Sequence, residues 1–224
     1  MAIKLHGSWM STATLRIGTT LTEKGLDFEF VPVDIRAKEH KQENFLPFNA
    51  ITNYIAHKYK EQGTELVKAD LLEMAINAVW MKVESHHCDI KHMLRIPVDE
   101  AVVEEATGKL NGVLDVYEAM LAKKKYLGGD KFSLADLHHL PNIRYILMTP
   151  KASLFTSHPH VSAWWSDISS HPAWTKAAAL SDGAILKQAQ TAMKGMQISQ
   201  FASFLFVFVL LYAFVLLWNA SSDL

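Results

Sequence analysis

Two hydroxyl side chains, Ser11 and Thr12, directly precede a stretch of helical character, ATLRIGTTLTEKG. A serine or threonine at such a place is an N-cap, because its side-chain oxygen can accept a hydrogen bond from the first helical turn. The same hydroxyl can instead donate to an anion, which the positive end of the helix dipole also favours. Taken alone, Ser11 is most simply a cap, and the anion site stays open as the second interpretation.

Two further pairs of residues could bind a ligand or a metal ion, but the sequence alone does not establish either role. His40 and Lys41 lie among acidic neighbours, and by themselves they indicate a solvated, mildly basic turn. Cys88 and His92 are four residues apart, so a helix could direct both toward one metal ion. Two ligands do not make a closed site, and we therefore expect no metal.

The composition excludes several classes of protein. The chain has 224 residues, of which 50% are hydrophobic and 20% charged, as is typical of a globular protein with a sizeable core. Lysine and arginine total 22 against 23 acidic residues, and the net charge of −1 argues against a nucleic-acid partner. The single cysteine, Cys88, cannot form an internal disulfide and fits a reducing compartment. Because the start MAIKLHG lacks a secretory signal, we expect a cytoplasmic protein.

The elements that would position Ser11 form a small α/β part. Residues 3–6 and 26–33 have strand character and flank the helix that follows Ser11, which Gly25 should end in a left-handed conformation. Two strands joined through a helix are expected to pair in parallel. A second helix should run from Ala50 to Gly63, and after it the chain becomes helical throughout. The sequence therefore predicts an α/β part followed by an all-α part.

The helical part contains its own start signals. Apolar residues at helical spacing predict two amphipathic helices, one carrying Leu71, Leu72, Met74, Ala75, Ala78 and Val79 and the other Val102, Ala106, Leu110, Val113, Tyr117 and Met120. Ser133 and Asp136 have the spacing of a capping box, which predicts that a third helix begins there. Pro159 and Pro172 stand where the first turn of a helix tolerates proline.

Six motifs in a fixed order point to a known family. They are GSWMSTAT, TEKGLDFEFVPVDI, KEHKQENFL, AITNYIAHKY, KFSLADLHHLPNI and HPAW, and they extend over most of residues 2–180. In this combination the chain resembles a plant glutathione transferase of the phi class. The resemblance implies a thioredoxin-like N-terminal domain (1–63) that binds glutathione, a helical domain (64–195) that holds the electrophile, and a homodimer. The implied activity is conjugation of the glutathione thiolate to hydrophobic electrophiles, in detoxification and stress response.

The resemblance also implies roles for four residues. Ser11 would donate a hydrogen bond to the glutathione sulfur, while Thr12, His40 and Lys41 would contribute to binding of the tripeptide. A hydroxyl and a helix N-terminus together lower a thiol pKa from its free value of about 8.5 toward neutrality. Glutathione would be a co-substrate, and no tightly bound cofactor is implied.

The sequence departs from the family pattern in two places near this site. Between Phe48 and Ala50 the family carries a further segment with a two-stranded hairpin, including a cis-proline and a Glu-Ser pair that contact glutathione. Without it, we expect a truncated domain with a marginal two-stranded sheet and weakened glutathione binding. Trp9 replaces the family's usual proline and adds bulk beside Ser11. The activity could be impaired, and the alternative is a non-catalytic binding protein for hydrophobic small molecules.

The C-terminal residues 198–218 form a hydrophobic tail. The run from Phe201 to Trp218 is 18 residues long and has no charged residue, and as a helix it would extend about 27 Å. This predicts a candidate membrane anchor, with the body of a tail-anchored protein on the cytosolic side. A run-on end from an altered transcript is the other interpretation of the tail.

Overall fold

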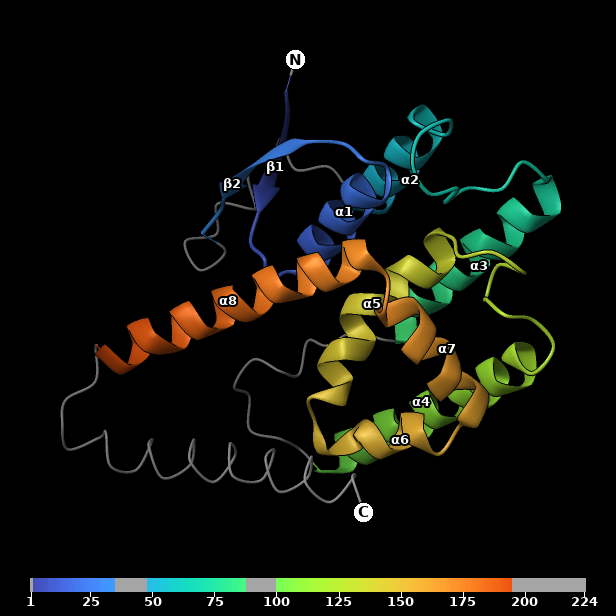
Figure 1. Ribbon diagram of the computed structural model, residues 1–224. Helices are drawn as coiled ribbons and strands as arrows, with labels where there is room; N and C mark the ends of the chain where they lie inside the picture. The colour runs from blue at the N-terminus through green and yellow to red at the C-terminus, as the bar shows by residue number, and fades with distance from the viewer. Residues whose placement is uncertain (1, 35–47, 88–99, 195–224) are drawn as a thin grey trace. The chain divides into compact units, whose positions relative to one another are not determined.

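The computed structural model describes residues 2–34, 48–87 and 100–194 (Figure 1). The chain divides into two compact units, residues 1–181 and residues 182–224. The second unit is described only through residues 182–194, which continue helix α8 (Pro172–Lys194). This division does not test the domain boundary that the sequence predicts between residues 63 and 64, which stays a prediction.

The first elements form the β-α-β unit that the sequence predicts. Strands β1 (Ile3–Gly7) and β2 (Phe28–Pro32) pair in parallel, with Leu5 opposite Phe30. Helix α1 (Thr12–Glu23) connects them. Within the described residues the sheet has these two strands alone.

Gly25 ends α1 in the way expected of a left-handed terminator. Its φ is 63°, and its N–H donates to the carbonyl of Thr22 at 3.0 Å, while Leu26 N donates to the carbonyl of Leu21 at 3.0 Å. A residue with a Cβ would be strained at this φ. The chain therefore reverses immediately after α1 and enters β2.

Trp9 packs into the core of the β-α-β unit. Its ring stacks on Phe30 with a centroid distance of 4.7 Å and an interplanar angle of 27°. A Cβ at Gly18 of α1 would lie 2.8 Å from the Trp9 ring, so the absence of a side chain at Gly18 makes room for the indole. The bulk that replaces the family's proline is accommodated in this core.

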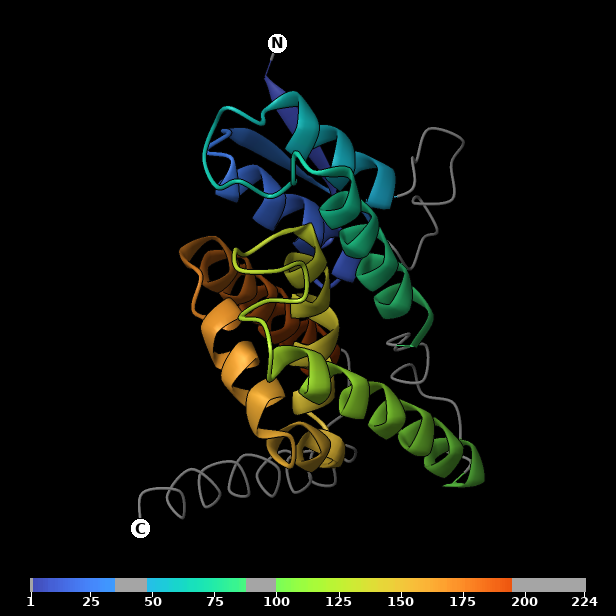
Figure 2. The same ribbon diagram turned by 90° about the vertical axis from the view of Figure 1, so that its right-hand side faces the viewer.

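The remaining named elements of the described chain are helical. They are α2 (Phe48–Lys58), α3 (Leu71–His87), α4 (Glu100–Leu121), α5 (Leu134–Leu147), the short 3₁₀ turn η3 (Pro150–Ala152), α6 (Ser153–Thr156), α7 (Pro159–Ser169) and α8. Figures 1 and 2 show α5 in the middle of this part, where it contacts α1, α3 and α7. Residues 134–145 are all buried, so α5 is the central core helix.

Helix α3 is present where the sequence predicts it, but its apolar residues do not all face inward. Leu71, Leu72 and Val79 are exposed by 80%, 69% and 58%. The buried side of α3 includes Trp80 and Met81, together with polar residues. Hydrophobic spacing alone could not separate these two faces, and one consequence is an apolar strip on the surface of α3.

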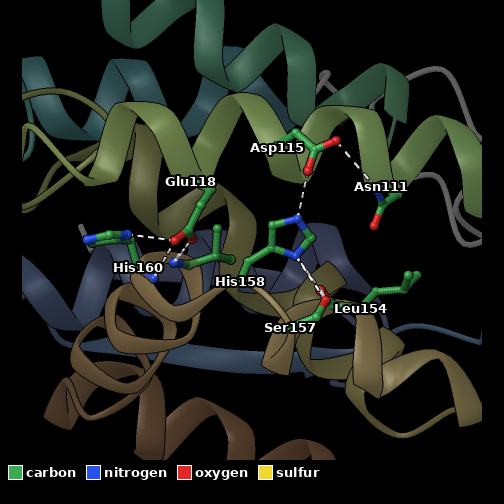
Figure 3. A network of polar contacts seen from close by, with 8 residues as sticks. Asn111, Asp115, Glu118, Leu154, Ser157, His158 and His160 are labelled. Carbon is green, nitrogen blue, oxygen red and sulfur yellow. Dashed lines mark hydrogen bonds and ion pairs between the residues drawn. The ribbon is translucent and has the colours of Figure 1, made fainter.

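A polar network joins α4 to the start of α7 (Figure 3). The carboxylate of Glu118 accepts the backbone N–H groups of His160 at 3.1 Å and Val161 at 3.0 Å, which lie in the first turn of α7. Nε2 of His158 lies 3.0 Å from Oδ1 of Asp115. Glu118 thereby satisfies two backbone donors that the beginning of a helix leaves unpaired.

Protonation of His158 should strengthen this junction. Burial alone would lower the pKa of His158, but its hydrogen bonds to Asp115 and to the carbonyl of Leu154, with the charges of Asp115 and Glu118, raise it above the ordinary value of 6.5. A raised histidine pKa contributes stability that is fully present below the unfolded pKa and is lost as the pH rises through the folded value.

We therefore expect Asp115→Asn to reduce the free energy of unfolding more at pH 5.5 than at pH 8.5. Urea denaturation at both pH values measures this difference. Asp130→Asn, at an exposed position in the loop before α5, serves as the control and should show no such pH dependence. An equal loss at the two pH values for Asp115→Asn would contradict the assignment of a charged pair to His158.

Among the described helices, none combines the length and the apolar character needed to cross a membrane. The candidate anchor at residues 198–218 lies outside the described residues.

Candidate active site

Ser11 occupies the N-cap position of α1, as the sequence predicts, but its side chain does not act as a cap. The backbone is extended there, with φ −88° and ψ 128°, and the carbonyl of Ser11 accepts the N–H of Leu15 at 3.0 Å. Its hydroxyl makes no capping hydrogen bond. The side chain is half-buried, and the first turn of α1 has no acidic residue to neutralise the helix dipole. A hydroxyl donor and a positive helix end therefore meet at one place.

The loop that carries Ser11 is held at both ends. The N–H of Ser11 donates to the carbonyl of Ser8 at 2.8 Å, and the N–H of Ser8 donates to Oγ1 of Thr14 at 3.2 Å. From α5, the hydroxyl of Tyr145 donates to the carbonyl of Met10 at 3.0 Å. Helices α1 and α5 thus fix the backbone on which the Ser11 hydroxyl is placed.

A buried ion pair anchors α1 one turn beyond this loop. The guanidinium of Arg16 pairs with the carboxylate of Glu84 from α3, and the two side chains are only 3% and 1% exposed. Arg16 Nε also donates to the carbonyl of His138 in α5 at 2.9 Å. The amide of Asn142 donates to the same Glu84 oxygen. Three helices are therefore tied together behind Ser11.

The two adjacent histidines of α5 are buried and take part in packing. His138 Nε2 lies 3.0 Å from the Thr52 hydroxyl of α2, and His139 Nε2 lies 2.7 Å from the Tyr117 hydroxyl of α4. Burial, and then the charge of Arg16, lowers the pKa of His138 well below its ordinary value. Burial also lowers the pKa of His139 to about 4. Both rings are neutral near pH 7, and neither is a general base at the surface.

The capping box predicted at Ser133 and Asp136 is confirmed. The Asp136 carboxylate accepts the backbone N–H of Ser133 at 3.0 Å, the backbone N–H of Leu127 at 3.0 Å and the indole N–H of Trp164 at 2.9 Å. Burial raises the pKa of Asp136, and these hydrogen bonds act in the opposite direction. The box fixes the start of α5, and with it the position of Tyr145, which holds the Ser11 loop.

The structure places Ser11 and Thr12 together at the N-terminus of α1, whereas His40 and Lys41 lie outside the described residues. Cys88 also lies outside them, as does His92. The described ranges contain no group of three or more His, Cys, Asp or Glu side chains that could hold a metal ion.

Sequence reasoning missed the residues that position the site. Thr14, Arg16 and Tyr145 hold the Ser11 loop or its helix, and Glu84 completes the buried ion pair. One signal was available for Arg16, which is the only charged residue from Thr12 to Thr22, in a stretch otherwise composed of threonine, glycine and apolar residues. A charge in such a helix needs a buried partner, although the sequence does not say which one.

Comparison with known proteins agrees with this arrangement. Residues 1–54 match the family model for the glutathione S-transferase N-terminal domain, and residues 72–172 match the model for the C-terminal domain. A glutathione S-transferase of Hyoscyamus muticus is 47% identical over 207 residues, with 79% of this chain and 98% of that protein covered. Glutathione transferase F7 of Populus trichocarpa superposes with a TM-score of 0.71 at 42% identity, covering 80% of this chain and 98% of the other.

A further solved relative carries a ligand. Glutathione S-transferase I from maize, in complex with an atrazine glutathione conjugate, superposes with a TM-score of 0.72 at 36% identity, covering 81% of this chain and 99% of the other. The chain therefore belongs to the glutathione S-transferase family, in its plant phi class. Its fold is the family's thioredoxin-like N-terminal domain followed by a helical domain.

Proposed function

We propose that this protein is a glutathione transferase that adds the thiolate of glutathione to hydrophobic electrophiles, as in detoxification. Ser11 stabilises the thiolate by donating a hydrogen bond to the sulfur. The observation that carries the proposal is the Ser11 hydroxyl, which lies at the N-terminus of α1 and is not used as a cap. The maize relative that holds a glutathione conjugate supports the same substrate class.

The chemistry requires no covalent intermediate on the protein. The thiolate is the nucleophile, and both the Ser11 hydroxyl and the dipole of the 12-residue helix α1 favour the charged form of the sulfur. Orientation of the thiolate beside a bound electrophile supplies the remaining rate enhancement. Thr12, His40 and Lys41 are proposed to bind the tripeptide.

The rate of conjugation of glutathione with 1-chloro-2,4-dinitrobenzene tests this function. The full chain should accelerate the reaction above the uncatalysed rate, in proportion to protein concentration. A folded chain that binds hydrophobic compounds but gives no acceleration would contradict the proposal and favour the non-catalytic binding protein.

We further propose that glutathione binds more weakly here than to a transferase with the complete N-terminal domain. The alignment with the Hyoscyamus relative is 207 residues long, which is more than 79% of this 224-residue chain. The relative therefore has residues without a counterpart here. The described sheet has two strands, which is consistent with a missing hairpin. Each lost charge-assisted hydrogen bond costs about 1.5 to 3 kcal/mol, so a raised KM for glutathione is expected.

A homodimer formed through α3 is the proposed assembly. Leu72 and Val79 are exposed and, with Ala75 between them, lie on one face of this helix. A surface of this kind is typical of an interaction site. Val79→Glu should convert the dimer to a monomer in light scattering, whereas Val116→Glu, at a similarly exposed position of α4, should not. A wild-type chain that is monomeric at micromolar concentration would exclude the dimer.

The proposed location is cytoplasmic, in keeping with a single cysteine, and the tail is proposed as a membrane tether. Alkaline extraction of membranes tests the tether, since a protein held only at the surface would be released.

A further inference from the structure

The peptide group between Met10 and Ser11 is held from both sides. Its carbonyl accepts the hydroxyl of Tyr145 at 3.0 Å, and its N–H donates to the carbonyl of Ser8 at 2.8 Å. Ser8 belongs to the same loop, whereas Tyr145 lies 135 residues from Met10 in the sequence, in α5. Because a peptide group is planar, hydrogen bonds at its two opposite ends fix its orientation. They thereby set the direction in which the side chain of Ser11 leaves the backbone.

Tyr145 is itself held in place by its neighbours. The residue is 9% exposed, and the guanidinium of Arg144 lies 5.7 Å from the centroid of its ring. Arg144 is equally buried and donates a hydrogen bond to the Ser181 hydroxyl of α8 at 3.3 Å. A side chain whose rotamer is fixed by packing places its polar atom more precisely than an exposed one. The phenol hydroxyl is therefore a fixed point to which the Ser11 loop is attached.

The position of the Ser11 hydroxyl depends on this attachment. Because the side chain makes no capping hydrogen bond, the first turn of α1 does not hold it. The backbone conformation of Ser11, with φ −88° and ψ 128°, is therefore what directs the hydroxyl. A hydrogen-bond donor weakens steeply when its distance or angle is wrong, and a displacement of about 1 Å can lower a rate about a hundredfold. A partner in α5 that fixes the preceding peptide group thus influences the strength of the donor at Ser11.

We propose that Tyr145 is a positioning residue for the conjugation reaction, whose hydroxyl holds the Met10–Ser11 peptide group so that the Ser11 hydroxyl is directed at the glutathione sulfur. This role rests on the proposed function, because it concerns the same thiolate. Ser11 lies within the N-terminal family domain, residues 1–54, and Tyr145 within the C-terminal one, residues 72–172. Ionisation of the thiol therefore depends on a hydrogen bond from the domain proposed to hold the electrophile.

Ultraviolet titration of the glutathione thiol, on the full chain saturated with glutathione, tests this role without an electrophile. In Tyr145→Phe the thiol pKa should rise above the wild-type value by about 0.5, which corresponds to an about threefold loss of thiolate stabilisation. The kcat for 1-chloro-2,4-dinitrobenzene should fall about three- to tenfold. The KM for glutathione should change by less than about twofold, since the variant removes no group proposed to bind the tripeptide.

A double variant distinguishes a positioning role from a direct one. In the Ser11→Ala background, Tyr145→Phe should leave the thiol pKa unchanged, because the hydroxyl that it positions is gone. Equal rises of the thiol pKa in both backgrounds would overturn the proposal, since Tyr145 would then act on the sulfur independently of Ser11. Tyr126→Phe is the matched control, because Tyr126 is 7% exposed and its hydroxyl donates to Asp167 of α7 at 2.6 Å. This control should lower the free energy of unfolding and leave the thiol pKa unchanged.

A nuclear magnetic resonance signal provides a second readout that needs no glutathione. Met10 and Ser11 form the only Met-Ser pair in the sequence, so ¹³C at methionine carbonyls and ¹⁵N at serine amides give one cross-peak from this peptide group. The cross-peak should shift in Tyr145→Phe and stay in place in Tyr126→Phe. An unchanged cross-peak in folded Tyr145→Phe, or a thiol pKa equal to that of the wild type, would overturn this proposal alone. A wild-type chain that does not lower the thiol pKa would overturn the proposed function together with it.

Discussion

Replacement of Ser11 by alanine should reduce the rate of glutathione conjugation by about ten- to hundredfold. The estimate follows from the loss of one hydrogen bond to an anionic sulfur, which is worth about 1.5 to 3 kcal/mol. The fold should be unaffected, because the hydroxyl makes no capping hydrogen bond and the backbone bonds of Ser11 do not depend on its side chain. Initial rates across a range of glutathione concentrations, with thermal unfolding of the same samples, provide the measurement.

Two companion variants make this prediction specific. Ser11→Thr keeps a hydroxyl at the N-terminus of α1 and should retain more activity than Ser11→Ala. Ser8→Ala removes another hydroxyl from the same loop. This hydroxyl accepts a long hydrogen bond, 3.4 Å, from the N–H of Met10, so its loss should have little effect. If Ser8→Ala and Ser11→Ala lowered the rate equally, the loss would come from a disturbed loop and not from the missing hydrogen-bond donor.

Replacement of Arg16 by methionine should cause the largest loss of stability, about 3 to 5 kcal/mol. The change leaves Glu84 buried without its ion-pair partner, and an uncompensated buried carboxylate is strongly unfavourable. It also removes the hydrogen bond from Arg16 Nε to the carbonyl of His138. Urea denaturation monitored by circular dichroism measures the free energy of unfolding.

The double variant Arg16→Met/Glu84→Met shows whether the loss of stability comes from leaving the Glu84 carboxylate buried without a partner. Replacing a buried pair with apolar residues of similar volume is often close to neutral, so the double variant should recover part of the stability lost by Arg16→Met. Lys109→Met, which breaks an exposed i,i+4 pair with Glu105, should cause no measurable change. A double variant that is less stable than Arg16→Met would show that the charges are not the cause.

The local signals of the sequence predicted much of the fold correctly. The parallel β-α-β unit, the left-handed Gly25 and the capping box at Ser133 and Asp136 are all found in the structure. Each depends on interactions among residues close in sequence, so a single chain contains the information. The placement of Ser11 at the N-terminus of α1 follows for the same reason.

Features that depend on distant residues were not predictable in the same way. Glu84 pairs with Arg16 across 68 residues, and Tyr145 holds the Met10 carbonyl across 135 residues. The outward apolar strip of α3 was also missed, because periodicity identifies an amphipathic helix without showing what covers each face. The binding roles of Thr12, His40 and Lys41, like the missing hairpin, stay predictions.

The central claim is that the Ser11 hydroxyl stabilises the thiolate of bound glutathione and so lowers the thiol pKa. Ultraviolet titration of the thiolate tests this claim most directly. The full chain, saturated with glutathione, should show a thiol pKa below the free value of about 8.5, and Ser11→Ala should return it toward that value. The same titration curve for both proteins, or no glutathione binding by a folded wild-type chain at millimolar concentrations, would contradict the account.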